Sequence, residues 1–487
     1  MVTLTYPKTV AAALKSADTV LLVAPQQAFA AGWHKKALPK GLAKRTGPLA
    51  ETKAGPLGTV VTSVDDSAPK RLVAGVLPDA GSRHNTPART EAVWNVARGA
   101  CLSGKCAVVC ALDEASHAQA VAIGIARTQH LFDATSGPKT KTSIAIVMTD
   151  AKGHVVPVSK RTREVVGGVR DAARLVDTPT ADLTTADFVR EAKKIVRGLP
   201  NVTSKVIIGD ALAKQGLGGV YGVGKAAAVA PRMLILDYKP ARAKRTVALV
   251  GKGVVYDTGG LHIKGRGSME SMKGDMGGAA AVIGAFRVLA ASKAKVRVIA
   301  ITPLAENSVD ANSYRPDDIL TMHSGHTVEI NNTDAEGRLL LGDAVSWAAR
   351  KVKPDVIIDI ATLTGAQLIA TGKSHAAVVS DRDGLQDLAC EVGRATGELC
   401  FPLLFCPEFH HREFKSQVAD MKNSVKDRMN AQSSCAAWFV WSHIDDLTVP
   451  WLHIDIAGPG WRDDRGTGFG VGLLAGLAES IRAEHLA

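Results

Sequence analysis

Short apolar runs alternate with amphipathic segments along the first third of the chain. Residues 91–98 and 114–127 have the spacing of polar and apolar positions that is typical of helices. The β-branched runs around them are predicted to be buried strands: TVLLVAP (19–25), KRLVAGVL (70–77), KCAVVCAL (105–112) and TSIAIVMTD (142–150). Strands that alternate with helices predict an α/β layer structure for this part of the chain.

A second α/β pattern follows residues 159–176, which are expected to form a connecting helix. Thr184 stands three residues before Asp187, the spacing of a capping box at the start of a helix. Residues 277–292 are predicted to be helical, and seven further segments are strand-like: SKVIIGD, MLILDY, TVALVG, KVRVIAIT, PDVIIDIATL, HAAVVS and WLHIDIA. Nearly continuous apolar strands are typical of a sheet that is covered by helices on both faces.

The length of 487 residues exceeds what one hydrophobic core usually serves and favours two or three domains. We place the boundary near residues 165–180, which predicts a smaller amino-terminal α/β domain over 1–165 and a larger domain over 166–487. The larger domain is expected to hold a mixed, mostly parallel sheet. Hydrophobic residues make up 46% of the chain and charged residues 22%, which excludes the disordered and fibrous classes.

Positive charge is concentrated near the amino terminus. Residues 1–170 hold 22 Lys and Arg against 11 Asp and Glu, a balance of +11 within a net charge of +12 for the whole chain. Such asymmetry is found in proteins that bind an acidic partner such as nucleic acid. Because no clustered basic motif accompanies the charge, we favour a solvated basic surface, and nucleic-acid binding stays open as the alternative.

The cysteines and the apolar runs indicate in which cellular compartment the protein is expected. Seven cysteines are scattered without a C-x-x-C pair, which favours free thiols in a reducing compartment over a disulfide framework. Asp18 stands beside only a short apolar run, so no secretory signal is expected. No stretch is expected to reach the roughly 20 apolar residues that cross a bilayer. These features predict a cytoplasmic protein without a membrane partner.

Two charged stretches follow predicted strands, at the place where α/β folds build their sites. In NTDAEGRLLLGDA, Asp334, Glu336 and Arg338 stand at alternate positions, so an extended stretch would point them the same way. The second stretch, LVGKGVVYDTGGLHIKGRGSMESMKGDMGGAAAV over 249–282, is rich in glycine. Its charged residues of interest are Lys252, Asp257, Lys264 and Asp275.

The two stretches together contain four acids that need neutralising. If Asp257, Asp275, Asp334 and Glu336 converge, their mutual repulsion costs several kcal/mol unless some are protonated or a cation binds. Two divalent cations balance four negative charges, and oxygen-rich ligation suits manganese, magnesium or zinc. The residues alone therefore predict a two-metal site, and a two-metal phosphoesterase remains possible at this point.

The same stretches resemble the leucine aminopeptidase (cytosol aminopeptidase) family. NTDAEGRLLLGDA is similar to the family signature, with Leu340 and Gly342 where Val and Ala are usual. The glycine-rich stretch is similar to the family pattern G-K-G-x-x-x-D-S-G-G-x-x-I-K, followed by M-x-x-D-M-G-G-A-A. Further matching segments lie at 305–325, 361–366, 417–423 and 453–461. The resemblance spans at least residues 170–487 and is loose over the first 165.

This resemblance implies a leucyl aminopeptidase, a hydrolase that removes hydrophobic residues such as Leu from peptides with a free amino terminus. It implies two divalent metal ions per subunit, manganese or zinc, with a metal-bridging hydroxide as the nucleophile. One ion would be bound by Lys252, Asp257, Asp275 and Glu336, and the other by Asp257, Asp334 and Glu336. A lysine ligand must be neutral, which requires nearby cations and exclusion of water.

The resemblance also implies the remaining roles. The ammonium of Lys264 would stabilise the oxyanion, and Arg338 would hold a bicarbonate ion that acts as general base. The side-chain pocket would be lined by Met272, Thr362, Gly365 and Ala457. Family members are typically homohexamers, and some bacterial members also bind DNA, which is the alternative role for the basic domain. Thr258, His262, Pro459 and Gly460 depart from the usual family residues, which bears on substrate preference.

Overall fold

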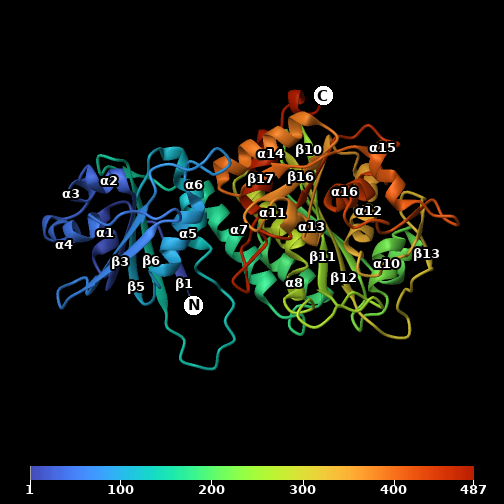
Figure 1. Ribbon diagram of the computed structural model, residues 1–487, viewed down its shortest axis with the longest axis horizontal. Coiled ribbons are helices and arrows are strands. Elements are labelled where there is room, and N and C mark those ends of the chain that lie inside the picture. The colour runs from blue at the N-terminus through green and yellow to red at the C-terminus, as the bar shows by residue number, and fades with distance from the viewer. Residues whose placement is uncertain (1) are drawn as a thin grey trace. The chain divides into compact units, whose positions relative to one another are not determined.

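The structure is a computed structural model that describes residues 2–487. It divides into two compact units, coloured from blue to red in chain order in Figure 1. The first unit comprises the chain up to Val166 together with Gly393–Leu399, and the second comprises Gly167–Val392 and Cys400–Ala487. The short segment 393–399 belongs to the first unit although it is distant in sequence, which no local pattern indicates.

The sheet of the first unit has the order β1-β6-β5-β2-β4-β3, and β7 pairs with β6. Its neighbours are parallel except for β3 on β4 and β7 on β6, which are antiparallel. The strands are β1 Val2–Thr5, β2 Thr19–Pro25, β3 Thr59–Val64, β4 Arg71–Leu77, β5 Lys105–Ala111, β6 Thr142–Thr149 and β7 Val155–Val156.

Helices cover both faces of this first sheet. Alternate residues of a strand point to opposite faces, and on β2 Leu22 packs in one cluster with Phe29 and Trp33, whereas Leu21 packs in another with Val93. The first face carries α1 Val10–Leu14, α2 Gln26–Ala30, α3 Trp33–Ala37 and α4 Lys40–Ala50. The second carries α5 Thr90–Gly99 and α6 Ala118–Ala126. A 3-10 turn over Ala115–His117 precedes α6, so this helix begins later than predicted.

The second unit is built on a nine-stranded mixed sheet in the order β17-β16-β19-β15-β10-β12-β9-β8, with β11 paired to β12. Most pairs are parallel, and the antiparallel pairs are β9 with β12, β8 with β9, and β16 with β19. The strands are β8 Val202–Ile208, β9 Arg232–Tyr238, β10 Thr246–Gly251, β11 Gly253–Asp257, β12 Arg297–Asn307, β15 Val356–Ala361, β16 Ala376–Ser380, β17 Cys400–Pro402 and β19 Trp451–Asp455. Two small sheets are formed by β13 Ile319–Thr321, β14 Thr327–Glu329 and β18 Met421–Lys422, and by β20 Trp461–Arg462 with β21 Arg465–Gly466.

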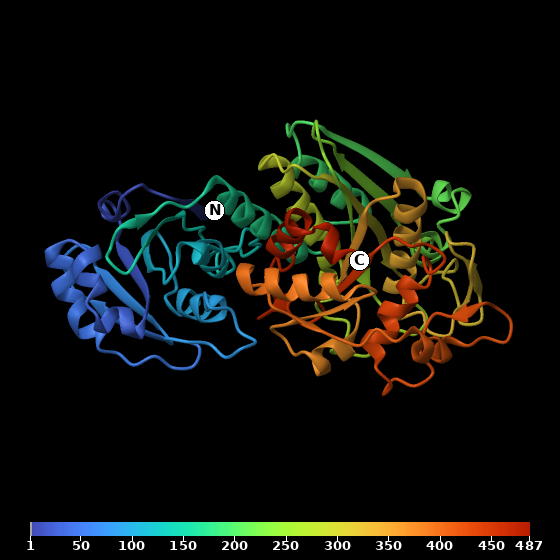
Figure 2. The same cartoon turned by 90° about the horizontal axis from the view of Figure 1, so that it is seen from above.

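Helices also cover both faces of the second sheet, as Figures 1 and 2 show from two directions. α11 packs with α17 over β10, β12 and β15, and α12 packs with α10 and α16 over the same strands. These helices are α10 Gly218–Gly224, α11 Gly277–Ala291, α12 Gly337–Trp347, α16 Gln432–Trp441 and α17 Val471–Ser480. The others are α7 Lys160–Asp177, α8 Thr185–Ile195, α9 Asp210–Lys214, α13 Gly365–Ala370, α14 Asp383–Thr396 and α15 Pro407–His410. The predicted fold class, two α/β parts with a mostly parallel sheet in the larger, is confirmed.

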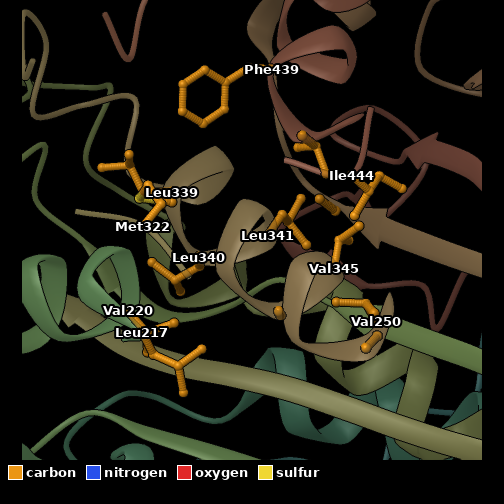
Figure 3. Close-up of a cluster of buried hydrophobic side chains, with 14 of the residues drawn as sticks. Leu217, Val220, Val250, Met322, Leu339, Leu340, Leu341, Val345, Phe439 and Ile444 are labelled. Atoms are coloured by element: carbon orange, nitrogen blue, oxygen red, sulfur yellow. The ribbon is translucent and has the colours of Figure 1, made fainter. Parts of the chain in front are cut away.

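Residues of α12 belong to a large cluster of buried hydrophobic side chains in the second unit (Figure 3). Successive residues of a helix are about 100° apart, so the leucines of this helix face different neighbours. Leu339, Leu340 and Leu341 are all buried in one cluster, which also contains Met322, Val220 and Ile444. Full burial of each leucine contributes about 1.5–3 kcal/mol. This packing fixes α12, and with it the charged residues at the start of that helix.

The structure confirms one expectation about local structure and differs from two others. Thr184 and Asp187 form the predicted capping box at the start of α8, with both reciprocal hydrogen bonds present. β8 is mostly exposed at the sheet edge, whereas its apolar run suggested a buried strand. The run Met272–Ala291 is long and apolar enough to cross a bilayer by length and composition, so the expectation that no stretch reaches this length is wrong. That run is 83% buried within the protein, as in a core helix.

Candidate active site

The sequence-predicted site residues come from strand ends and helix starts at one edge of the large sheet. Lys252 lies between β10 and β11, Asp257 ends β11, and Thr362 follows β15. Asp275 precedes α11, and Glu336 is the N-cap residue of α12. The carboxyl ends of parallel strands meet at a common edge, and helices begin there. The topology therefore brings residues together that are up to 110 positions apart in the sequence.

All eleven predicted residues line one pocket with a volume of about 940 Å³. The pocket lies wholly within the second unit. The predicted residues in its wall are Lys252, Asp257, Lys264, Met272, Asp275, Asp334, Glu336, Arg338, Thr362, Gly365 and Ala457. This volume lies within the range of about 300–1,000 Å³ that is typical of small-molecule sites.

The sequence predicted that an extended backbone would point Asp334, Glu336 and Arg338 the same way, and this prediction is wrong. Asp334 lies in a turn, Glu336 has helical backbone angles of φ −75° and ψ −35°, and Arg338 is the second residue of α12. The stretch is not extended, so alternation of side chains does not align the three. A tight turn followed directly by a helix brings them to the same pocket.

Lys252 lies at the centre of a buried charge cluster. Its Nζ is 2.8 Å from Oδ1 of Asp275 and 2.9 Å from Oε1 of Glu336, and it donates to the carbonyl of Thr362 at 2.9 Å. Burial acts to lower the pKa of Lys252, but the carboxylates of Asp275, Glu336 and Asp257 outweigh burial and raise this pKa above its ordinary value. Without a cation in the pocket, Lys252 is therefore an ammonium group.

Lys264 pairs with the other two acids. Its Nζ is 2.8 Å from Oδ2 of Asp257 and also contacts Oδ1 of Asp334. The opposite oxygen of Asp257 accepts hydrogen bonds from the side chain of Asn307 at 2.8 Å and from the backbone N–H of Gly259 at 2.9 Å. These bonds orient Asp257 so that one oxygen remains directed toward the pocket.

The carboxylates form a cluster that suits metal binding. One oxygen each from Asp257, Asp334 and Glu336 lies within 4.8 Å of the other two. Burial raises the pKa of Glu336 to about 8 and that of Asp275 to about 6, and it also raises the pKa of Asp334. Burial is the largest cause of these raised pKa values, and the negative charge of Asp257 raises each of them further, so the acids repel one another. This donor set, rich in oxygen, fits divalent cations.

Arg338 has the features of an anion-binding residue. Its side chain is 4% exposed, and its Nε and Nη1 have no hydrogen-bond partner among the described residues. The guanidinium lies 5.9 Å from the centre of the Phe414 ring. Burial lowers the pKa of Arg338 to about 10. Buried guanidinium donors normally find partners, so the free N–H groups beside this pocket fit a small anion such as bicarbonate.

The remaining predicted residues line an uncharged part of the wall. Thr362 Oγ1 donates to Oδ1 of Asp275 at 2.7 Å, so the wall and the charge cluster are directly connected. Gly365 begins α13, and a Cβ there would meet no atom within 4 Å. Ala457 follows β19. Small residues at these positions leave room for a substrate side chain.

Sequence reasoning missed the buried polar residues that hold the turn before α12. Asn423 donates from Nδ2 to the carbonyls of Asn332 at 2.7 Å and Ala335 at 3.2 Å. Tyr314 donates to the carbonyl of Thr333 at 2.6 Å. The segment 417–423 was identified only as part of the resemblance, because an asparagine gives no local signal of a partner some 90 residues away.

A carboxylate cluster with a lysine at its centre, at the carboxyl edge of an α/β sheet and inside an open pocket, defines a metal-dependent hydrolase. The family model described as "Cytosol aminopeptidase family, catalytic domain" matches residues 170–475, and "M17 aminopeptidase N-terminal domain 2" matches residues 44–138. The chain belongs to the cytosol aminopeptidase family and is a metal-dependent aminopeptidase. The resemblance inferred from the motifs is confirmed.

Relatives of known sequence agree with this assignment. A protein from Mus musculus named "Probable aminopeptidase NPEPL1" is 44% identical over 432 residues, which cover 86% of this chain and 82% of that protein. A "Probable cytosol aminopeptidase" from Rhodopseudomonas palustris is 39% identical over 373 residues, covering 74% of this chain and 73% of that protein. Both likenesses extend well beyond the local motifs.

Solved structures share the complete fold. The leucyl aminopeptidase from Trypanosoma brucei in complex with bestatin matches with a TM-score of 0.89 at 36% identity, covering 99% of this chain and 95% of that one. The bottromycin maturation enzyme BotP in complex with Mn matches with a TM-score of 0.79 at 28% identity, covering 96% of this chain and 99% of that one. The likeness therefore includes both units of the chain.

Proposed function

We propose that this enzyme removes hydrophobic amino-terminal residues such as Leu from peptides, with two divalent cations, manganese or zinc, in each subunit. The proposed ligands are Lys252, Asp257, Asp275, Asp334 and Glu336. One observation carries the proposal: four carboxylates converge on two lysines in a single pocket. The Mn complex of the structural neighbour BotP supports manganese as one of the metals.

The ion pairs of Lys252 explain how an ammonium group becomes a metal ligand. The acids raise the pKa of this lysine only because their negative charge is not neutralised. Two dications would neutralise Asp275 and Glu336, so burial, which lowers the pKa of a lysine, would then dominate. Lys252 would release its proton when the cations bind, and its amine lone pair would become available as a ligand.

The proposed chemistry assigns separate tasks to Lys264 and Arg338. When bound, the two cations would supply Lewis-acid polarisation of the scissile carbonyl and a water of lowered pKa. Lys264, released from Asp257 and Asp334, would donate to the oxyanion that develops on that carbonyl. Arg338 would hold a bicarbonate ion through its free Nε and Nη1 groups, and this ion would supply a general base beside the cations. No protein carboxylate is then needed as general base.

The substrate side chain is proposed to lie against Met272, Thr362, Gly365 and Ala457, which line the same pocket as the acids. A free α-amine of the peptide would lie beside the carboxylate cluster, which explains removal of single residues from the amino terminus. A protonated or acylated amine cannot ligate a metal. The pocket wall is apolar or small at these positions, which favours residues such as Leu.

Several wider properties are part of the same proposal. Residues 1–165 and 166–487 would act as amino-terminal and catalytic domains, in agreement with the unit boundary at Val166. The protein would be cytoplasmic and homohexameric, as relatives named cytosol aminopeptidases and the family resemblance suggest. The basic charge of the first domain is proposed to be a solvated surface.

A substrate comparison tests the proposal. Hydrolysis of leucine-p-nitroanilide, of its N-acetylated form and of p-nitrophenyl phosphate would be measured with manganese present. The proposed function predicts turnover of the first compound only, because the second lacks a free amine and the third is a phosphoester. Equal turnover of the blocked amide would contradict an aminopeptidase, and preferential turnover of the phosphoester would favour a phosphoesterase.

A further inference from the structure

Three of the four residues that line the proposed side-chain pocket, Thr362, Gly365 and Ala457, come from two loops that leave adjacent parallel strands, and Met272 comes from a separate turn. Ala361 ends β15 and Asp455 ends β19, and these residues are register partners in the sheet. Ile456 donates its backbone N–H to the carbonyl of Ala361 at 2.7 Å. Beyond this bond, one loop continues to Thr362 and Gly365 and the other continues to Ala457. The width of the pocket depends on how these two loops are joined.

The carboxylate of Asp455 accepts hydrogen bonds from both of these loops. Its Oδ1 accepts hydrogen bonds from the backbone N–H of Leu363 and from that of Ala457, both at 3.1 Å. Its Oδ2 accepts from the hydroxyl of Thr364 at 2.7 Å. Leu363 and Thr364 belong to the loop after β15, and Ala457 belongs to the loop after β19. One side chain therefore holds both walls of the pocket.

Burial of the Asp455 carboxylate is unfavourable unless hydrogen bonds or opposite charges compensate for the loss of water. The residue is 1% exposed, and a carboxylate out of water needs hydrogen bonds or counter-charges to remain ionised. Three hydrogen bonds satisfy it, and the charged groups that face it are His453 on its own strand and Arg338 on α12. An apolar residue could fill the same space, but it would not accept bonds from both loops.

The loop that Asp455 holds also contacts the proposed metal ligands. The carbonyl of Thr362 accepts a hydrogen bond from Lys252 at 2.9 Å, and the hydroxyl of Thr362 donates to Asp275 at 2.7 Å. The neighbouring Thr364 caps α13 by accepting from the backbone N–H of Gln367. Movement of this loop would therefore alter the pocket wall first and the charge cluster second.

We propose that Asp455 is a positioning residue that sets the selectivity for the amino-terminal residue by fixing the separation of the two pocket walls. The inference rests on the proposed aminopeptidase function and deepens it. Asp455 touches neither the substrate nor the proposed metals. It acts through Leu363, Thr364 and Ala457, whose positions define the shape that the substrate side chain meets.

Two substitutions separate hydrogen bonding from charge. Asp455→Asn keeps the shape and can keep all three bonds, because its Oδ1 still accepts from both backbone N–H groups. Its Nδ2 would donate to the hydroxyl of Thr364, which then donates to Ser433 Oγ, 2.7 Å away. Asp455→Ala removes all three bonds of this carboxylate and leaves two partly buried N–H groups without their acceptor. The bond from the backbone N–H of Gly458 to Oε1 of Gln367 at 2.6 Å remains and still ties the loop after β19 to α13.

The test measures kcat and KM on p-nitroanilides of Leu, Phe and Ala, together with bound metal. For Asp455→Ala we expect the ratio of kcat/KM for Leu over Ala to fall by about tenfold, since one to three methylenes in a fitted pocket are worth that factor or more. We expect Asp455→Asn to keep the ratio within about twofold. Both variants are expected to retain the metal content of the wild type.

Ser433→Ala is the matched control, because it removes the other partner of the Thr364 hydroxyl and leaves the connection between the loops intact. Its selectivity is expected to equal that of the wild type. Wild-type selectivity in Asp455→Ala, or equal loss in Asp455→Asn and Asp455→Ala, would overturn the proposal. If Asp455→Ala does not fold, Thr364→Val, which removes the Oδ2 bond, the cap of α13 and the Ser433 contact but keeps both Oδ1 bonds, must show a smaller loss of the same ratio. Absence of turnover in the wild type would instead count against the proposed function.

Discussion

The substitution Gly337→Ala would displace the side chain of Lys252 while every proposed metal-ligand residue stays unsubstituted. A Cβ added at Gly337 would lie 2.4 Å from Cε and 2.6 Å from Nζ of Lys252. Carbon atoms in ordinary contact are about 3.5–4.0 Å apart. Gly337 is the first residue of α12, where the backbone accepts alanine. In Gly337→Ala the end of the lysine side chain must therefore move by about 1 Å.

The structure sets the magnitude of the effect. Nζ of Lys252 is held by three contacts of 2.8–2.9 Å and is almost completely buried, so displacing it breaks contacts that fix its position. A misplacement of about 1 Å in a catalytic constellation can lower turnover by about 100-fold. Overpacking costs about 1–3 kcal/mol, and the better helix propensity of alanine offsets about 1 kcal/mol of this. The variant is expected to fold.

The assay combines turnover of leucine-p-nitroanilide, metal content by mass spectrometry, and thermal unfolding. Gly41→Ala is the control, because Gly41 is the second residue of α4 and a Cβ there meets no atom within 4 Å. We expect Gly337→Ala to lose about 100-fold in kcat and part of its bound metal, while the control keeps both. Wild-type kcat and metal content in Gly337→Ala would refute the idea that the position of Lys252 matters.

Four further outcomes are expected. Lys264→Ala should keep fold and metal content but lose about 10²–10³-fold in kcat, measured on leucine-p-nitroanilide; unchanged turnover would contradict its role. Asp334→Ala should also lose bound metal, which elemental analysis detects, and full metal occupancy would remove it from the ligand set. Gly342→Ala should lower the free energy of unfolding by about 1–3 kcal/mol, because its Cβ would lie 2.5 Å from the ring of His443, and His443→Ala should relieve most of this loss in the double variant. Duplex DNA should show no gel shift at moderate salt, whereas a shift that weakens steeply with salt would favour a nucleic-acid role for the basic domain.

The central strands of both sheets could be predicted because buried strands leave continuous apolar runs, whereas β1, β3, β7 and β17 were not predicted. TVALVG and PDVIIDIATL correspond to β10 and β15, whose side chains are buried on both faces. The short helices α1–α4 were not predicted. They have at most eleven residues, lie against one face of the sheet, and are separated by prolines or glycines. Such segments give too few helical repeats for periodicity to show.

The residues of the site could be predicted from the sequence, but the backbone geometry that brings them together could not. Counting acids near strand ends was sufficient to suggest two metals, and the motif resemblance supplied the expected roles. The extended geometry assumed for Asp334 and Glu336 was wrong, because a turn held by Asn423 and Tyr314 replaces it. Asp455 likewise carries no sequence signal, since two of its three bonds reach Leu363 and Thr364, which only the fold brings close.

The central claim is that the converging acids exist to bind two dications. The most direct measurement removes metal from the purified protein with a chelator, adds manganese in steps, and follows bound metal and leucine-p-nitroanilide turnover in the same samples. If two dications are required, the enzyme shows no turnover without metal and full turnover near two bound ions per chain. Undiminished turnover in a sample shown to contain no metal would contradict it.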